Sequence, residues 1–515
     1  MVDSAIGIEF GSTRVKACMI GRDHRIVAEG SYGWENRLEN GVWTYSYDEI
    51  AVALQRCFAS LKKDYRERYG ETLSTCSALG ISAMMHGMIA SDDAFSPILP
   101  FRTWRNTITG RAAAELTDLF SFNIPQRWSI AHLYQTYLED RETASRIKHV
   151  ETLASYVHRL LSGVNGIGLD DASGMFPIDP ETLDYDAGMA SKLRDLTGLD
   201  VFSLFPSVYK AGTGCGLLTE AGALLLDPDG DFRPGVPMVP PEGDAGTGMA
   251  ATCSVRIGTG NISAGTSDFA MVVTDKKLSV HREIDVVTTP MGVPVAMVHC
   301  NNCTTDINSW INLFGEFASL IGADIDKSEL YSTLYSASLS GSPDVKGLMS
   351  CGYYSGEGVT DFDSGIPVFL HRPDAPVHLG DFMRLHLMSS LATLKIGMDI
   401  LRDEGVGFAQ INGHGGFFKT PEAGQRIMSA AIGAPVSVME TAGEGGAYGM
   451  ALLAAYSSWG NGMSLEDYLE KKVFAGSESR TVMAGDDEVR GFDDFIGEYR
   501  KMLLIERKAL EVFNA

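Results

Sequence analysis

The sequence predicts an α/β protein built from two domains, and three observations lead to this fold class. The chain has 515 residues, which is too long for one ordinary core and suggests two domains of about 250 residues each. Short β-rich runs alternate with helical segments along the chain. A turn made of one glycine and two hydroxyl residues recurs 254 residues later, again between two β-rich runs.

The elements of the first half follow in order. Residues 6–10 and 15–20 are β-rich runs separated by a short turn, so they predict two joined strands. Residues 48–65 place apolar side chains at spacings of three and four, which predicts an amphipathic helix. Residues 78–90 read as a strand that runs into a turn. The Pro- and Gly-rich segment 228–241 predicts a loop ahead of the second domain, and we expect domains 1–246 and 247–515.

The second half begins as the first does. Residues 262–271 can be laid beside residues 8–17, each segment having a Gly followed by two hydroxyl residues between β-rich runs. Further on, a helical stretch at 383–404 precedes a Gly-rich turn at 411–416, and residues 444–451 open another helix. A hairpin duplicated at half length is the layout of an ATPase whose two domains each present a phosphate loop to one cleft.

Composition and charge exclude several function classes. The formal net charge is −24, which disfavours nucleic acid and anionic membranes as partners. No apolar run approaches the ~20 residues of a membrane helix, and the first residues do not form a secretory signal. The eight cysteines are scattered, as in reduced cytosolic proteins, so we expect a cytoplasmic location. The pair Cys300 and Cys303 lacks the second pair that a structural zinc site needs.

The two repeated turns have the composition of phosphate loops. Glycine lets the backbone approach a ligand closely, successive N–H groups converge on one oxygen, and the hydroxyls add donors. Each turn alone is also compatible with a plain hairpin, but the matching positions favour phosphate. A Walker-type nucleotide fold is unsupported, because the chain has no Gly-x-x-x-x-Gly-Lys-Ser/Thr motif. The candidate phosphate-binding residues of the two turns are Gly11, Ser12, Thr13, Gly265, Thr266 and Ser267.

Asp244 is the candidate catalytic residue. It stands in a Gly-rich turn just before the small-residue helix start at 249–251. One interpretation is a helix N-cap. The other is a general base, which in phosphoryl transfer needs only to orient a hydroxyl and accept its proton late.

Other side chains are candidates for binding a sugar and a nucleotide base. Met85 and His86 stand at the end of the strand expected within residues 78–90, although a lone His is more often structural. Trp104 and Asn106 form an aromatic and amide pair of the kind found in sugar sites and equally in surface clusters. The glycines of 413–416 either let a flat base slide along the backbone or allow tight packing of strand against helix.

Taken in order, these motifs resemble those of the FGGY carbohydrate kinases, and within that family those of the xylulose kinases. The family opens with Gly-x-Asp-x-Gly-Thr and a basic residue soon after, which corresponds here to residues 7–12 and Lys16. Its catalytic Gly-Asp turn corresponds to Gly243 and Asp244, and its second phosphate motif to residues 264–267. Its adenosine-side glycines correspond to Gly413, Gly415 and Gly416.

The resemblance implies two actin-like (ribonuclease H-like) ATPase domains flanking a central cleft. The first would carry the sugar site and one phosphate loop, and the second would carry the other phosphate loop and the adenosine site. ATP and Mg²⁺ are the expected cofactors, with Glu9 contacting the metal through water and Asp244 serving as the base. The expected activity is phosphorylation of a ketopentose hydroxyl, D-xylulose to D-xylulose 5-phosphate, in a homodimer. L-Ribulose or another polyol is the alternative acceptor.

Two departures from the family pattern keep other function classes open. Glu9 stands where the family has Asp, and Trp104 is followed by Arg105 and Asn106 where the family has Trp-x-Asp-x-Arg. A catalytically idle actin-like protein that binds sugar or nucleotide as a regulator would tolerate both changes. An actin-like ATPase acting in assembly or as a chaperone would need no sugar pocket at all.

Overall fold

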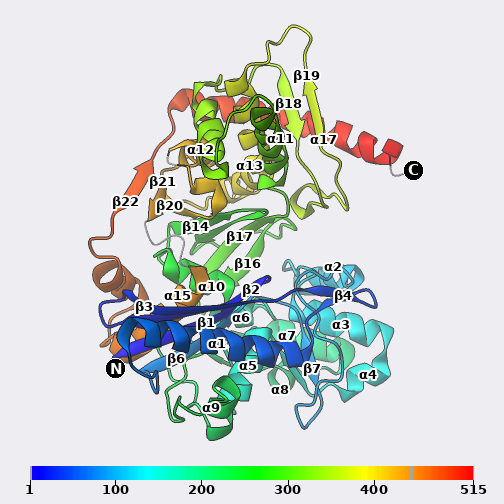
Figure 1. Cartoon of the computed structure of the whole chain (residues 1–515). Helices are drawn as coiled ribbons and strands as arrows, with labels where there is room; N and C mark the ends of the chain where they lie inside the picture. The colour runs from blue at the N-terminus through cyan, green and yellow to red at the C-terminus, as the bar shows by residue number, and fades with distance from the viewer. Residues whose placement is uncertain (1–2, 421, 440–444, 514–515) are drawn as a thin grey trace. The chain divides into compact units, whose positions relative to one another are not determined.

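The computed structural model describes residues 3–420, 422–439 and 445–513. They form two compact units, each with its own central sheet and covering helices (Figure 1), which confirms the predicted two-domain α/β class. The first unit consists of Met1–Val255, Asp285–Val295 and Glu444–Gly476. The second consists of Arg256–Ile284, Ala296–Gly443 and Ser477–Ala515. Two stretches from the second half of the chain therefore belong to the first unit.

The main sheet of the first unit has five strands, arranged so that the ends of two strands and a helix start lie close together. The order is β13 (Glu242–Gly243), β6 (Ala78–Ala83), β1 (Ser4–Phe10), β2 (Arg14–Gly21) and β3 (Ile26–Gly33). β1 pairs with β2 antiparallel and with β6 parallel, and β13 continues the parallel side of the sheet. The predicted strands at 6–10 and 15–20 are confirmed as the β1–β2 hairpin.

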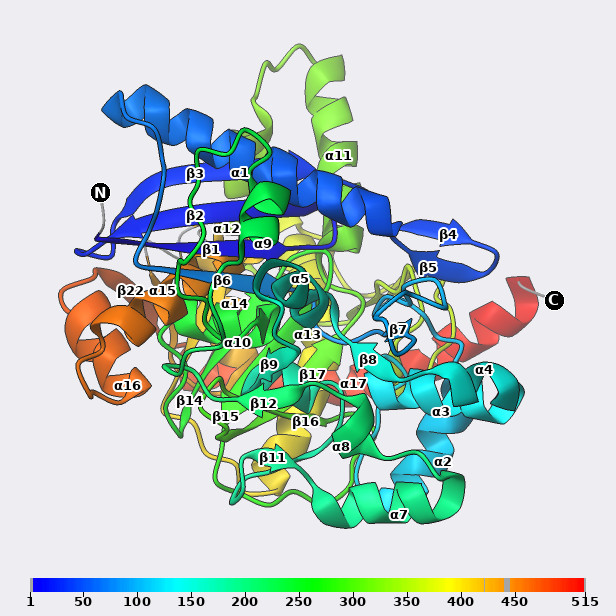
Figure 2. The same ribbon diagram turned by 90° about the horizontal axis from the view of Figure 1, so that it is seen from below.

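Helices cover both faces of this sheet. α1 (Tyr47–Tyr69) packs on β2 and β3, whereas α15 (Gly445–Trp459) packs on β1 and β6, and Figure 2 shows the two helices on opposite sides of the strands. α1 begins with a capping box, in which Ser46 and Glu49 bind each other's backbone N–H groups, and it ends at Gly70 in a left-handed conformation. The helix predicted at 48–65 is therefore confirmed. α15 contains the helix start expected at 444–451, of which Glu444 lies outside the described residues.

The remaining elements of the first unit surround the sheet. The helices are α2 (Gly110–Phe120), α3 (Ser129–Glu139), α4 (Arg141–Arg146), α5 (Leu153–Ser162), α6 (Leu169–Ser173), α7 (Ala187–Thr197), α8 (Val201–Leu204), α9 (Glu220–Leu226), α10 (Asp244–Ala251) and α16 (Leu465–Tyr468). The short strands are β4 (Arg37–Glu39), β5 (Val42–Thr44), β7 (Ile89–Ser91), β8 (His149–Glu151), β9 (Gly166–Gly168), β10 (Ile178–Asp179), β11 (Asp184–Tyr185), β12 (Ser207–Tyr209) and β16 (Asp285–Thr288).

The second unit repeats the hairpin of the first. Its strands follow the order β17 (Pro294–Cys300), β15 (Asp268–Val273), β14 (Thr259–Ala264), β20 (Gln410–His414), β21 (Val436–Met439) and β22 (Ser479–Val482). β14 pairs with β15 antiparallel and with β20 parallel, as β1 pairs with β2 and β6. The other elements are α11 (Thr304–Leu320), α12 (Lys327–Ala337), β18 (Leu348–Cys351), β19 (Val368–His371), α13 (Leu379–Asp403), α14 (Ala423–Ile432) and α17 (Asp486–Phe513).

The core of the second unit gathers around one long helix. α13 is buried along most of its length and contains all but the last residue of the helix predicted at 383–404. All eight cysteines lie in the described residues and none of them forms a disulfide there; Cys300 and Cys303 are buried in this core. Among the described helices, none combines the length and the apolar character that crossing a membrane requires.

Candidate active site

Asp244 is the first residue of α10, directly after the edge strand β13. Gly243 is the N-cap of this helix, so the N-cap interpretation of Asp244 is wrong. The Asp244 side chain is exposed, and its Oδ1 accepts a hydrogen bond from the backbone N–H of Met85 at 3.1 Å. Desolvation by the surrounding protein raises the pKa of Asp244, while backbone N–H groups of Met85 and of the first helical turn lower it. A carboxylate so held can accept a proton from a hydroxyl group in solution or on a ligand.

Glu9 is the second acidic side chain of this site. It lies near the end of β1, directly opposite Lys16 in the β1–β2 pair. Its Oε2 accepts a hydrogen bond from the backbone N–H of Ala447, in the first turn of α15, at 3.2 Å. A Cβ atom at Gly446 would come within 2.4 Å of Glu9 Oε1, so a larger residue there would displace this carboxyl group. Glu9 therefore ties the start of α15 to the end of β1.

The acidic groups around Glu9 are compatible with a bound divalent cation. Burial and the nearby Asp244 carboxylate raise the pKa of Glu9 to about 7, against the opposing effects of Lys16 and the Ala447 N–H. Two carboxylates that repel each other form a hard oxygen donor set, which suits Mg²⁺. Among the described residues, no three His, Cys, Asp or Glu side chains cluster as a complete metal site. The residues thus fit a cation that takes its other ligands from water and phosphate.

The first candidate phosphate loop, residues 11–13, is the turn between β1 and β2. Aromatic side chains fix its backbone: Trp34 Nε1 donates to the Gly11 carbonyl at 2.7 Å, and the Tyr45 hydroxyl donates to the Ser12 carbonyl at 2.6 Å. The Trp104 indole N–H donates to Ser12 Oγ at 3.3 Å. Thr13 and Lys16 remain exposed. The loop is therefore rigid in its backbone and open at two of its candidate phosphate donors.

The four candidate sugar residues are not all in one place. Met85 is bound to Asp244 through its backbone, and the next residue, His86, has a left-handed φ of 72°. His86 is buried beside Trp128, with Nδ1 3.3 Å from the Gly174 carbonyl oxygen. Trp104 instead contacts the phosphate loop, as described above.

The Asn106 side chain is hydrogen-bonded to the backbone around it. Its Oδ1 accepts from the N–H of Trp43 at 2.8 Å, and its Nδ2 donates to the carbonyl groups of Trp43 and Thr103 at 2.8 and 2.9 Å. The side chain is 2 % exposed. The Asn106 amide therefore ties β5 to the backbone of Thr103, and the neighbouring Arg105 stacks on the Trp43 ring, 3.9 Å from its centroid.

In the second unit, the second candidate phosphate loop and the Gly-rich turn lie side by side. Residues 265–267 form the turn between β14 and β15, held because Thr304 donates to the Gly265 carbonyl through its N–H and its hydroxyl. Gly415 has a φ of 100°, and a Cβ there would lie 2.4 Å from the Ala264 carbonyl oxygen. Gly413 lies against the Phe418 ring. The tight-packing interpretation thus applies to both glycines, and Gly416 has open space around its Cα.

Three buried carboxyl groups behind Asp244 were not among the candidate site residues. Asp170, Asp171 and Glu242 are each at most 1 % exposed. The signals that could have found them are the adjacent acids at 170 and 171 and an acid two residues before Asp244. Their burial could not be read from the sequence, because paired acids usually mark a solvated surface.

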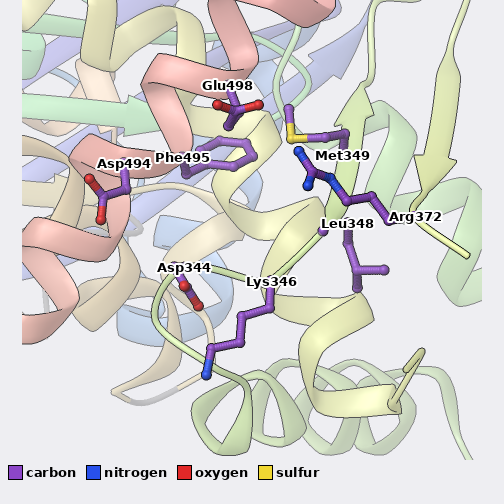
Figure 3. A pocket seen from close by; sticks show the side chains of 9 residues that line it. Asp344, Lys346, Leu348, Met349, Arg372, Asp494, Phe495 and Glu498 are labelled. Carbon is purple, nitrogen blue, oxygen red and sulfur yellow. The ribbon is translucent and has the colours of Figure 1, made fainter. Parts of the chain in front are cut away.

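A separate cavity of about 190 Å³ opens in the second unit, between α17 and the β18–β19 pair. Figure 3 shows its lining, in which Lys346 and Arg372 stand among three acidic side chains. None of the residues that the sequence singled out lines it.

Comparison with known proteins assigns both halves of the chain. The N-terminal domain of the FGGY family of carbohydrate kinases matches residues 4–249, and the C-terminal domain matches residues 260–458. Similar solved structures include xylulose kinase from Rhodospirillum rubrum (TM-score 0.78, 16 % identity, 99 % of each chain covered). Gluconate kinase from Lactobacillus acidophilus has a TM-score of 0.80 at 15 % identity, covering 99 % of this chain and 98 % of that one.

Glycerol kinase from Plasmodium falciparum has a TM-score of 0.75 at 13 % identity, with 98 % of each chain covered. No curated protein matched the sequence. At these identities the structural likenesses establish the two-domain fold, which kinases of three different substrates share.

Proposed function

This chain belongs to the FGGY family of carbohydrate kinases, and we propose that it transfers the γ-phosphoryl group of ATP to a ketopentose, converting D-xylulose to D-xylulose 5-phosphate. The observation that carries the proposal is Asp244, an exposed carboxylate at a helix start, held by a backbone N–H and close enough to Glu9 to raise its pKa. The sugar is proposed from the motif likeness to xylulose kinases.

Asp244 acts as the general base in the proposed reaction. The sugar hydroxyl, on carbon five of the ketopentose, attacks the γ-phosphorus, and the bond from that phosphorus to the β,γ-bridging oxygen breaks. Asp244 takes the hydroxyl proton late in the reaction, and ADP leaves. Met85 and His86 contribute to the sugar pocket, whereas Asn106 supports it from behind through β5.

The phosphates are bound by the candidate loops of the two units. Successive backbone N–H groups and hydroxyls donate to phosphate oxygens, and Lys16 adds a positive charge. Glu9 would hold Mg²⁺ through water, and the bound ion would neutralise charge on the phosphates. The residues proposed to bind ATP are Gly11, Ser12, Thr13, Lys16, Gly265, Thr266, Ser267, Gly413, Gly415 and Gly416.

The test measures ADP release with MgATP and each of D-xylulose, L-ribulose, D-ribulose, glycerol and gluconate, with a no-sugar control. We expect D-xylulose to give the highest kcat/KM. Asp244→Asn should bind both substrates and lose about 10²–10⁴-fold in kcat, the usual contribution of a general base. Asp186→Asn is the matched control, because Asp186 also lies at a helix start of the first unit, capping α7, and Asn caps equally well.

Two outcomes would overturn the proposal. Near wild-type turnover by Asp244→Asn would remove Asp244 from the catalytic role. A strong preference for another acceptor would leave the proposed kinase activity in place but replace D-xylulose as the proposed substrate.

A further inference from the structure

The start of α10, which carries Asp244, has no cap of its own. The N-cap residue is Gly243, which has no side chain to accept the free N–H groups of the first turn. A carboxyl group from a different element does so: Asp170 Oδ2, on α6, accepts the N–H of Gly246 at 2.9 Å. Asp170 is fully buried, so this bond lies away from solvent.

The contact depends on close approach from both sides. A Cβ atom at Gly246 would lie 2.5 Å from Asp170 Cγ, and one at Gly243 would lie 2.8 Å from Asp170 Oδ2. Gly243 at the N-cap and Gly246 in the first turn of α10 therefore leave space for the Asp170 carboxyl group. Substituting Gly246 would displace this carboxyl group while leaving the Asp244 side chain itself unchanged.

The segment that carries Asp170 is itself fixed to the strand that leads into Asp244. Glu242 Oε2 accepts the backbone N–H of Asp170 at 3.1 Å, and the N–H of Gly168 donates to the Pro241 carbonyl at 2.7 Å. Glu242 thus caps α6, while Asp170 of α6 caps α10. Each of the two segments supplies the carboxyl group that the other helix start lacks.

On its far side, α6 is braced by the stretch from the second half of the chain. The Thr288 N–H donates to Ser173 Oγ at 3.0 Å, and the Thr288 hydroxyl donates to the Leu169 carbonyl at 3.0 Å. α6 is therefore held on both sides, and Asp170 cannot follow α10 if that helix shifts. A fixed acceptor of this kind sets where the first turn of α10, and with it the Asp244 side chain, comes to rest.

We infer that Asp170 is a positioning residue for the phosphoryl transfer, acting through the first turn of α10 on the orientation of Asp244. The inference rests on the proposed role of Asp244 as the base. It predicts an effect on turnover rather than on substrate binding, because Asp170 is buried and its carboxyl group accepts a hydrogen bond from the first turn of α10. Burial and the neighbouring acids raise the pKa of Asp170 well above its usual range, so a neutral amide should replace it well.

The experiment compares kcat and KM for four variants with MgATP and the best sugar. Asp170→Ala removes the acceptor of the Gly246 N–H, and we expect kcat to fall about 10–100-fold, since misplacing a reacting group by about 1 Å costs on that scale. Both KM values should stay within about threefold. Asp170→Asn keeps an oxygen at the acceptor position and should restore kcat to within about threefold of wild type.

Asp171→Ala is the matched control. Asp171 is equally buried on the same helix, but its Oδ2 accepts a hydrogen bond from the Thr152 hydroxyl at 2.6 Å, so its side chain is held by Thr152 rather than by an N–H of α10. Its loss should lower stability without lowering kcat more than about threefold. Gly246→Ala displaces Asp170 from the other side and should reproduce the low kcat, which keeps the test available if Asp170→Ala does not fold.

The outcomes separate the inference from the proposed function. If Asp244→Asn is inactive but Asp170→Ala and Gly246→Ala keep wild-type kcat, the inference fails and the base assignment stands. Equal losses of kcat in Asp170→Ala and Asp171→Ala, or no rescue by Asp170→Asn, would also overturn it. If Asp244→Asn keeps its turnover, the proposed function itself fails.

Discussion

Replacing Lys62 tests how much a buried ion pair contributes to the stability of the first unit, because Lys62 is a buried cation surrounded by three acids. It lies on α1 with its side chain 9 % exposed, and its Nζ is 2.6 Å from Asp227, 3.4 Å from Asp229 and 2.8 Å from Asp231. Of these partners only Asp227 is buried, at 3 % exposed. Asp227 also accepts the N–H of Phe232 at 2.9 Å, and Lys62 is the cation that compensates its charge.

Replacing Lys62 with Met keeps the volume of the side chain and removes its charge. The Asp227 carboxylate would then be buried without a cation, and breaking a buried pair in this way costs about 3–5 kcal/mol. Asp229 and Asp231 are more exposed, and each adds at most about 1 kcal/mol. The total of about 3–7 kcal/mol, at about 2–4 °C per kcal/mol for a unit of this size, should lower the first thermal transition by about 6–28 °C.

Differential scanning calorimetry measures this shift, and a second variant identifies its cause. In Lys62→Met/Asp227→Asn the uncompensated charge is gone, so most of the lost stability should return. A single variant as stable as wild type would refute the reasoning, as would a double variant no more stable than the single one. Lys63→Met is the control, since Lys63 is 76 % exposed and its ion pair is the exposed one with Glu67 at 3.7 Å.

The other predictions concern the pH dependence of stability and Glu9, the carboxylate proposed to hold Mg²⁺ through water. Burial raises the pKa of Asp171 and of Glu357 to about 7, so their stability contribution is complete below pH 4 and is lost as pH rises through 7. Thermal unfolding should therefore occur at a higher temperature at pH 5.5 than at pH 8, and a flat or rising profile would contradict this. Glu9→Gln should raise the Mg²⁺ concentration for half-maximal rate at least about 10-fold with little change in the sugar KM. Glu9→Asp, one methylene shorter, should lose the Ala447 bond and about 1 kcal/mol of stability, measured by calorimetry.

Local patterns in the sequence predicted local structure well. The turn at 11–13 and its counterpart at 265–267 were expected between paired strands, because glycine and short hydroxyl residues suit tight turns. The amphipathic spacing that marked α1 was equally reliable, since it reports directly which side of a helix is buried. These features depend on neighbours in the sequence.

What the sequence did not reveal depends on residues far apart in it. Glu9 accepts a hydrogen bond from Ala447, 438 residues away, and no local pattern encodes that meeting. Asp170 caps a helix that begins more than 70 residues later, although its own surroundings look like an exposed acidic pair. Asn106 was expected to bind sugar from its aromatic neighbour, but its side-chain amide donates to the backbone carbonyl groups of Trp43 and Thr103.

The chain order of the first unit has a consequence for how the protein is made. α15 packs on β1, β6 and α10, so the sheet of this unit lacks one covering helix until residue 459 has been synthesised. At about 5–20 residues per second, the roughly 200 residues that separate Val255 from Trp459 take a ribosome about 10–40 s. Throughout that interval a nascent chain presents the apolar side of β1 and β6 to its surroundings. A truncated product ending near residue 255 should accordingly recruit chaperones or be degraded, rather than accumulate as a folded domain.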